Sequence, residues 1–185
     1  GSTDRDDIVN LLGWNYRLTE IQAALGIEQL KKLSFFTEYR QQLAQYLTEN
    51  LQKFDFLVTP KAQDGCEHGY YLYPVRFLKD KIGISRQLFV EAIQKEGVSI
   101  SAGYVKPVYL EPIFQKKIAY GSQGCPFKCP LYGGNPDYSS DALPNVAWAQ
   151  EWTFSTEVIN STLTVTDIDE IIEAFHKVWD NLDIL

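Results

Sequence analysis

Three polar residues, Asn15, Tyr16 and Arg17, lie directly before a stretch with helical periodicity. An amide, a phenol and a guanidinium at this place could bind an anion, because the first N–H groups of a helix lack internal partners and the helix dipole is positive there. The spacing of Thr19 and Gln22 predicts a capping box that starts the helix. A phosphate or carboxylate site is therefore one interpretation, and a capped surface helix without a ligand is the other.

Two cysteines, Cys125 and Cys129, lie in a Gly- and Pro-rich stretch that predicts a long loop. The third cysteine is Cys66, and the two histidines, His68 and His176, are far from the pair in the sequence. The cysteine number is odd and the spacing is not that of a zinc finger. We therefore expect free thiols in a reducing cytoplasm and no metal site, with a redox or metal role for this loop as an alternative.

A helical arm is predicted over residues 19–53, and it would position the polar residues at 15–17. Apolar side chains recur at helical spacing over 21–33 and again over 36–51, which predicts two helices that run on continuously with a kink near Ser34. A helix of this length usually packs against something outside its own small domain. The arm is thus a candidate contact surface.

Residues 1–18 are interpreted as a lead-in loop. Gly1 and Ser2 resemble a cleavage scar, and the sequence has no methionine. We therefore expect an excised piece of a longer protein.

Residues 54–185 are predicted to form an α+β domain, with a small, mostly antiparallel sheet covered by helices. Pro74 favours an edge or a bulge for its strand. The elements expected are a strand over 69–77, a helix over 85–96 capped by Ser85, a short strand over 98–101, a helix over 145–151, an extended stretch over 157–163, and a C-terminal helix capped by Thr166 with Asp169.

The composition restricts the classes of partner. The chain has 185 residues, 45% of them hydrophobic and 22% charged, so it can bury a core. Its formal net charge of −7 argues against nucleic acid and anionic membranes, which attract basic surfaces. No apolar run approaches the roughly 20 residues that span a bilayer. We expect a soluble, cytoplasmic protein.

The sequence Asn-Tyr-Arg at 15–17, followed by LTEIQAALG at 18–26 and EQLKKL at 28–33, resembles the DegT/StrS-type PLP-dependent sugar aminotransferases. The resemblance implies the small C-terminal domain of the aminotransferase fold, in which the long N-terminal helices precede the sheet. It also implies that Asn15 reaches across a homodimer to the phosphate of the pyridoxal cofactor in the other subunit, with Tyr16 and Arg17 orienting that site. Arg17 could equally be a structural salt-bridge residue.

A second stretch, GYVKPVYLEPIF at 103–114, resembles a segment that borders the sugar site in this family. Tyr104, Pro107, Tyr109 and Pro112 fill the family pattern, although many members carry histidine at the position of Tyr109. A tyrosine there removes a titrating group and keeps a hydrogen-bond donor. The resemblance implies that Tyr104 and Tyr109 bind substrate, whereas packing under the loop with satisfied hydroxyls remains equally open.

The Cys125 and Cys129 loop is similar to an insert in some members of the family, and we expect it to close the substrate side. The resemblance places the lysine that forms a Schiff base with the cofactor, and its acidic partner, in an N-terminal domain outside this chain. We therefore assign no catalytic residue here and expect neither activity nor bound PLP for the chain alone. The parent would transfer an amino group from glutamate or glutamine to a nucleotide-linked keto sugar. A non-catalytic dimerisation or partner-binding domain is the alternative.

Overall fold

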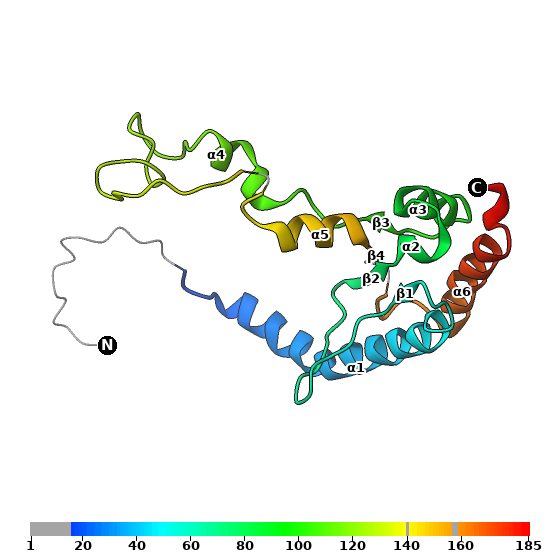
Figure 1. Cartoon of the computed structure of the whole chain (residues 1–185). Coiled ribbons are helices and arrows are strands. Elements are labelled where there is room, and N and C mark those ends of the chain that lie inside the picture. The colour runs from blue at the N-terminus through cyan, green and yellow to red at the C-terminus, as the bar shows by residue number, and fades with distance from the viewer. Residues whose placement is uncertain (1–15, 140, 157–158) are drawn as a thin grey trace. The chain divides into compact units, whose positions relative to one another are not determined.

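The computed structural model describes residues 16–139, 141–156 and 159–185 (Figure 1). The described residues divide into two compact units, one ending at Phe35 and the other running from Phe36 to Leu185. The domain bounds inferred from the sequence stay a prediction. The helices are α1 (Glu20–Leu51), α2 (Lys79–Ile82), α3 (Arg86–Lys95), α4 (Pro112–Gln115), α5 (Pro144–Trp152) and α6 (Val165–Asp180), with 3-10 turns η1 (Val108–Leu110) and η2 (Leu182–Ile184); the strands are β1 (Leu57–Val58), β2 (Tyr73–Phe77), β3 (Ser101–Ala102) and β4 (Thr153–Thr156).

The two helices predicted for the arm form one continuous helix, α1, of 32 residues. All its buried side chains lie in its C-terminal third and face the core of the second unit: Leu43, Ala44, Leu47, Thr48 and Leu51. Earlier apolar residues of the helix, such as Leu25 and Leu30, are exposed. The hydrophobic contribution of α1 to the core therefore comes from its last turns.

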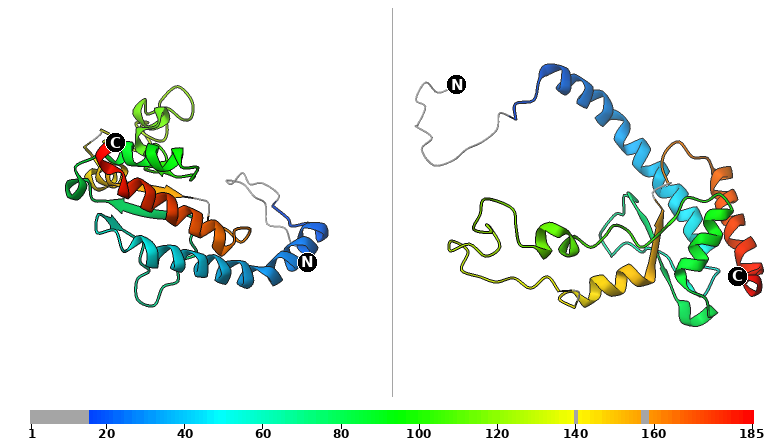
Figure 2. Two further views of the ribbon diagram at one scale, coloured as in Figure 1. Left: turned by 90° about the vertical axis from the view of Figure 1, so that its right-hand side faces the viewer. Right: turned by 90° about the horizontal axis from the view of Figure 1, so that it is seen from above.

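The sheet has the order β1-β2-β4-β3 and every pairing is antiparallel, so the predicted α+β class is confirmed. Along β2 the buried side chains alternate with exposed ones, as expected for a sheet with one covered face. Figure 2 shows α3, α6 and the later part of α1 on that same side of the sheet. The opposite face carries Pro74 and Arg76, which are exposed.

Five phenylalanines form the centre of the core. Phe89 of α3 packs against the other four at ring-centroid distances of 5.1 to 6.1 Å: Phe56, Phe77, Phe154 and Phe175. Each ring is at most 2% exposed. Because these rings come from a loop, two strands and two helices, their burial joins the sheet to its helical cover.

The cap of α6 corrects one prediction. Thr164, not Thr166, is the N-cap, and its reciprocal partner is Asp167. The Thr164 backbone N–H donates to Asp167 Oδ2 at 2.6 Å. Asp169, which the sequence interpretation had paired with Thr166, instead accepts a hydrogen bond from Tyr46 Oη at 2.6 Å.

The strand bounds also differ from the predictions. β2 begins at Tyr73 rather than at residue 69, and the short strand predicted over 98–101 is β3 at Ser101–Ala102. Pro74 lies in a strand with neighbours on both sides, but β1 pairs only with Arg76 and Phe77. The part of β2 that holds Pro74 is therefore an edge on the β1 side, where a missing N–H disturbs no pairing.

The extended stretch predicted over 157–163 is wrong for the residues that can be compared. The strand β4 lies earlier, at Thr153–Thr156, and residues 160–162 form a bend and a turn. Asn160 closes that turn by accepting a hydrogen bond from the backbone N–H of Thr162 at 2.8 Å. Within the described part of the chain, no helix has the length and apolar character needed to cross a membrane.

Candidate functional site

The first predicted site is at the start of α1. Asn15 lies outside the described residues, whereas Tyr16 and Arg17 are described and exposed; 87% of Tyr16 is accessible. The helix that follows, α1, begins at Glu20, and the dipole of a helix is positive at its N-terminus. Two of the three predicted residues are thus accessible beside a helix terminus.

The predicted capping box at this terminus is confirmed. The Thr19 backbone N–H donates to Gln22 Oε1 at 3.0 Å, and the Gln22 N–H donates to Thr19 Oγ1 at 3.3 Å. The threonine hydroxyl also donates to Gln22 Oε1 at 3.1 Å. These bonds make Thr19 the capping residue, and α1 begins directly after it at Glu20.

The second predicted site begins at Gly103, which adopts a φ of +77°. Its N–H donates to Thr153 O at 2.8 Å, and its carbonyl accepts from Ser155 Oγ at 3.0 Å. A Cβ atom at this position would lie 2.7 Å from Gln150 Nε2. Only glycine fits both the left-handed backbone and the close approach of α5, so Gly103 sets the direction in which the next residues leave the sheet.

The two tyrosines predicted to bind substrate differ in how far they are buried. Tyr104 is 50% exposed directly after Gly103, whereas Tyr109 is 8% exposed within η1. The Tyr109 carbonyl accepts a hydrogen bond from Gln115 Nε2 at 2.8 Å. Tyr104 is therefore accessible at the surface, whereas Tyr109 is buried.

A group of cations and tryptophans beside the exposed sheet face was missed by the sequence interpretation. The Arg76 guanidinium lies 5.8 Å from the Trp148 ring, and the Lys79 ammonium lies 5.0 Å from the Trp152 ring. The two indoles stack at 6.0 Å. The spacing of the tryptophans by one helical turn could have predicted their stacking, but the cations come from distant residues.

Arg86 was also missed, and it links α3 to the junction of α5 and β4. Its Nη1 donates to the carbonyl oxygens of Gln150 and Thr153, the latter at 2.7 Å. Burial lowers the pKa of this guanidinium. Because Gln150 and Thr153 also contact Gly103, Arg86 supports the backbone from which Tyr104 projects.

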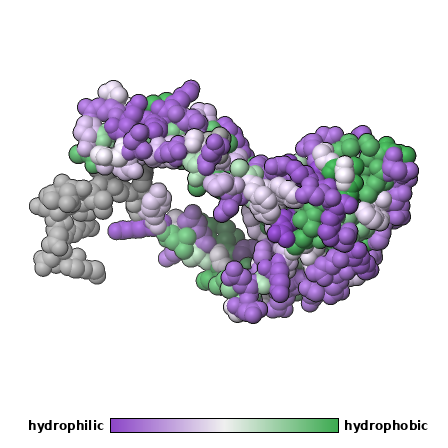
Figure 3. Space-filling view, in the orientation of Figure 1, coloured by the Kyte–Doolittle hydropathy of each residue, from purple (hydrophilic) through white to green (hydrophobic). Residues whose placement is uncertain are grey.

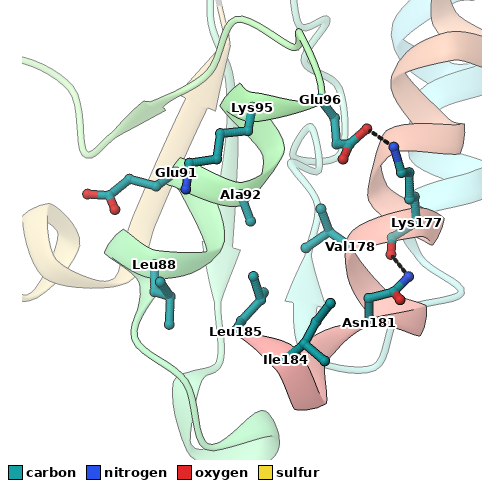
Figure 4. A pocket seen from close by; sticks show the side chains of 10 residues that line it. All are labelled: Leu88, Glu91, Ala92, Lys95, Glu96, Lys177, Val178, Asn181, Ile184 and Leu185. Carbon is teal, nitrogen blue, oxygen red and sulfur yellow. Dashed lines mark hydrogen bonds and ion pairs between the residues drawn. The ribbon is translucent and has the colours of Figure 1, made fainter.

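A cavity of about 260 Å³ lies between α3 and α6, and Figure 4 shows its lining. Leu88, Ala92, Val178 and Ile184 supply an apolar wall, and Lys177 pairs with Glu96 at 2.5 Å on its rim. Figure 3 shows apolar surface in the same region. None of the four described candidate residues lines this cavity, so it is distinct from both predicted sites.

Metal ligation finds no support in the described residues, where no group of three or more His, Cys, Asp or Glu side chains could hold an ion. The three cysteines are free thiols, and Cys129 is buried.

Comparison with known proteins identifies the family. The model of the DegT/DnrJ/EryC1/StrS aminotransferase family matches residues 2–134. A putative L-glutamine:3-amino-2,3-dideoxy-scyllo-inosose aminotransferase of Streptoalloteichus tenebrarius is 30% identical over 182 residues, which are 95% of this chain and 42% of the relative. A UDP-4-amino-4,6-dideoxy-N-acetyl-beta-L-altrosamine transaminase of Campylobacter jejuni is 35% identical over 107 residues, which are 58% of this chain and 28% of the relative.

The fold agrees with this assignment. The X-ray structure of an aminotransferase from Psychrobacter cryohalolentis superposes with a TM-score of 0.72 at 25% identity, covering 97% of this chain and 44% of that one. The chain thus spans less than half the length of these relatives. With the family model matching both predicted site segments and the fold matching a solved aminotransferase, this chain belongs to the DegT/DnrJ/EryC1/StrS aminotransferase family.

Proposed function

We propose that this chain serves as the small domain of a PLP-dependent sugar aminotransferase, which transfers an amino group from glutamate or glutamine to a nucleotide-linked keto sugar. The family match over residues 2–134 carries the proposal, because it includes both the 15–17 and the 104–109 segments. The names of the relatives support the two substrate classes, since one names a UDP-linked amino sugar and another names glutamine. A cytoplasmic location accords with the free thiols.

The start of α1 fits the phosphate of pyridoxal phosphate, the cofactor that carries the amino group between the two substrates in such enzymes. Arg17 supplies a positive charge, Tyr16 supplies a hydroxyl donor, and both are exposed beside the end of a long helix. We assign Asn15 as the amide donor to this phosphate. In the proposed homodimer, the cofactor held by these residues belongs to the other subunit.

The catalytic lysine and its acidic partner are not assigned to this chain. Several described lysines already form ion pairs on the surface: Lys79 with Glu151 at 2.6 Å, Lys81 with Asp55 at 3.1 Å and Lys177 with Glu96 at 2.5 Å. We propose that both catalytic groups belong to the part of the relatives' length that this chain does not match. The chain alone is then inactive.

Tyr104 and Tyr109 form the sugar side of the proposed site. Tyr104 is the more accessible of the two, and its position depends on Gly103 and on the carbonyl oxygens that Arg86 holds. Tyr109 stabilises the same segment through its buried ring and its carbonyl. We therefore assign Tyr104 as the residue that contacts the sugar and Tyr109 as the residue that positions the segment.

The proposal is tested by supplying the missing part. The chain is joined to the N-terminal portion of a family member that contains the lysine, and PLP binding is followed by its absorbance. Replacing Asn15 with Ala removes a hydrogen bond to a charged phosphate, which contributes about 1.5–3 kcal/mol. We expect cofactor affinity to fall about tenfold to a hundredfold.

Asn181→Ala is the matched control. Asn181 is exposed at the end of α6, where its side chain donates to Lys177 O at 2.8 Å, so the same change there should leave cofactor affinity unchanged. Unchanged affinity in Asn15→Ala would remove Asn15 from the site. Failure of the joined protein to bind PLP at all would count against the aminotransferase proposal itself.

A non-catalytic dimerisation or partner-binding domain is the second candidate. The exposed apolar side chains at the beginning of α1 favour it, among them Ile21 (76% exposed), Leu25 (63%) and Leu30 (68%). Sedimentation of the chain at increasing concentration measures self-association. A tight dimer of the chain, together with no PLP binding in the joined protein, would favour this second function.

A further inference from the structure

The segment 68–70 is held against α1 by two side chains of that helix. Arg40 Nη1 donates to the Gly69 carbonyl at 3.2 Å, and Gln41 Nε2 donates to the His68 carbonyl at 3.1 Å. Arg40, Gln41 and His68 are all half-buried. Backbone groups of the segment therefore take their partners from side chains of α1 rather than from a strand.

Tyr70 completes the segment in an unusual backbone conformation. Its φ is +48°, in the left-handed region that is unfavourable for an L-residue. Its backbone N–H donates to Nδ1 of His68 at 2.9 Å, and the centroids of the two rings lie 4.3 Å apart. The Tyr70 ring also stacks on the buried ring of Tyr73 at 6.0 Å. The hydrogen bond to His68 thus stabilises a strained backbone turn.

The hydrogen bond between Tyr70 and His68 requires one particular protonation state. Nδ1 accepts a hydrogen bond only when it carries no proton, as in the neutral tautomer with its proton on Nε2. In the imidazolium both ring nitrogens are donors, so an Nδ1–H and the Tyr70 N–H would oppose each other. Because imidazoles take up a proton between about pH 5 and 8, a contact of this kind changes with pH in the physiological range.

Charged and titratable side chains share with His68 the two surface cavities that it lines. The three carboxylates among them can accept hydrogen bonds from an imidazolium, whereas Arg40 already donates to Gly69. A protonated His68 therefore has other partners available, while the Tyr70 N–H loses its acceptor. Glu38, Arg40, Tyr46 and Glu49 come from α1, and Cys66, Glu67, Tyr70 and Tyr71 come from the loop that contains His68.

We propose that His68 is a pH-sensitive switch that releases the segment 68–70 when its imidazole takes up a proton from solvent. The hydrogen bond from the Tyr70 N–H breaks, Tyr70 leaves the left-handed conformation, and its ring separates from Tyr73. No covalent bond of the backbone changes, so a return to neutral pH restores the segment. The inference depends on the hydrogen bonds of this segment and not on the proposed aminotransferase function.

The test follows the Tyr70 amide of the isotopically labelled full chain by NMR. Its hydrogen exchange, corrected for the intrinsic rate at each pH, measures whether the N–H is bonded. As the pH falls from about 8 to about 5, the protection should fall about tenfold, the equivalent of one lost hydrogen bond. The midpoint should equal that of the His68 ring resonances, and the nuclear Overhauser contacts between the Tyr70 and Tyr73 rings should disappear over the same range.

Two substitutions at His68 and one at the other histidine define the cause. His68→Asn supplies an oxygen that can accept from the N–H two residues on but does not titrate, so the protection of the Tyr70 amide should be independent of pH. His68→Ala removes the acceptor, so the protection should be low at every pH. His176→Asn is the matched control, because His176 is exposed on α6 beside Phe54, and it should behave as the wild type.

Three results would overturn the proposal. In the wild type, the protection of the Tyr70 amide could stay constant over this pH range, or its midpoint could differ from that of the His68 ring. In His68→Asn, the protection could keep the pH dependence of the wild type, which would assign the effect to another group.

Discussion

Replacement of Gly103 by Ala tests whether this glycine directs the tyrosine segment. Gly103 has a φ of +77°, which costs an L-residue about 1–2 kcal/mol. The new Cβ would also lie 2.7 Å from Gln150 Nε2 and 3.2 Å from the backbone oxygen of the same residue. The glutamine side chain can move, but the backbone oxygen is held by Arg86. Overpacking of this kind costs about 1–3 kcal/mol, so the total loss in unfolding free energy should be about 2–5 kcal/mol.

Gly83→Ala is the matched control for this substitution. Gly83 has a nearly equal φ of +74°, but nothing lies within 4 Å of a Cβ placed there. It should therefore lose only the backbone contribution of about 1–2 kcal/mol. Urea unfolding of both variants gives the two values, and their difference isolates the contact with Gln150. Equal losses would refute the inference that close approach of α5 requires glycine at 103.

Two further substitutions test the core and the corrected helix cap. Tyr73 Oη lies 2.6 Å from Thr48 Oγ1 in the core, and Tyr73→Phe should lower the unfolding free energy by about 1 kcal/mol. Burial raises the pKa of Tyr73 to about 12 from 10.0, so the stability that its neutral form contributes is complete below pH 10 and is lost as the pH rises toward 12. Urea unfolding should therefore show a steeper alkaline loss in the wild type than in Tyr73→Phe, and identical slopes would contradict this. Thr164→Ala should destabilise the chain by about 1 kcal/mol through loss of the α6 cap, whereas Thr166→Ala should change the unfolding free energy by less than about 0.5 kcal/mol; the reverse order in thermal or urea unfolding would restore the original cap assignment.

The helix caps show which features neighbouring residues alone can predict and which they cannot. Thr19 with Gln22 and Ser85 before α3 were predicted correctly, because each is the single capping residue before an apolar repeat. At α6 the sequence contains two overlapping patterns of the same spacing, one from Thr164 and one from Thr166. A local rule does not distinguish them, and the position where the preceding turn ends decides between them.

The candidate site shows the same limit: its segments could be predicted from the sequence, but the burial of their side chains could not. The segments that contain Tyr16, Arg17, Tyr104 and Tyr109 were recognisable from their residue types and order. That Tyr104 is half exposed while Tyr109 is buried depends on how η1 packs, which neighbouring residues in the sequence do not reveal. The role of Asn15 stays a prediction.

The sequence by itself determined the family, the α+β class, the start of α1 and the apolar faces of α3 and α6, because these depend on motifs and periodicities within a few residues. Only the tertiary structure decided the strand order, the tie from Arg86 to Thr153 and the close approach of α5 to Gly103. Each of these joins residues that are tens of positions apart. Their contacts arise when the core excludes water and the backbone groups must find partners, so no local pattern records them.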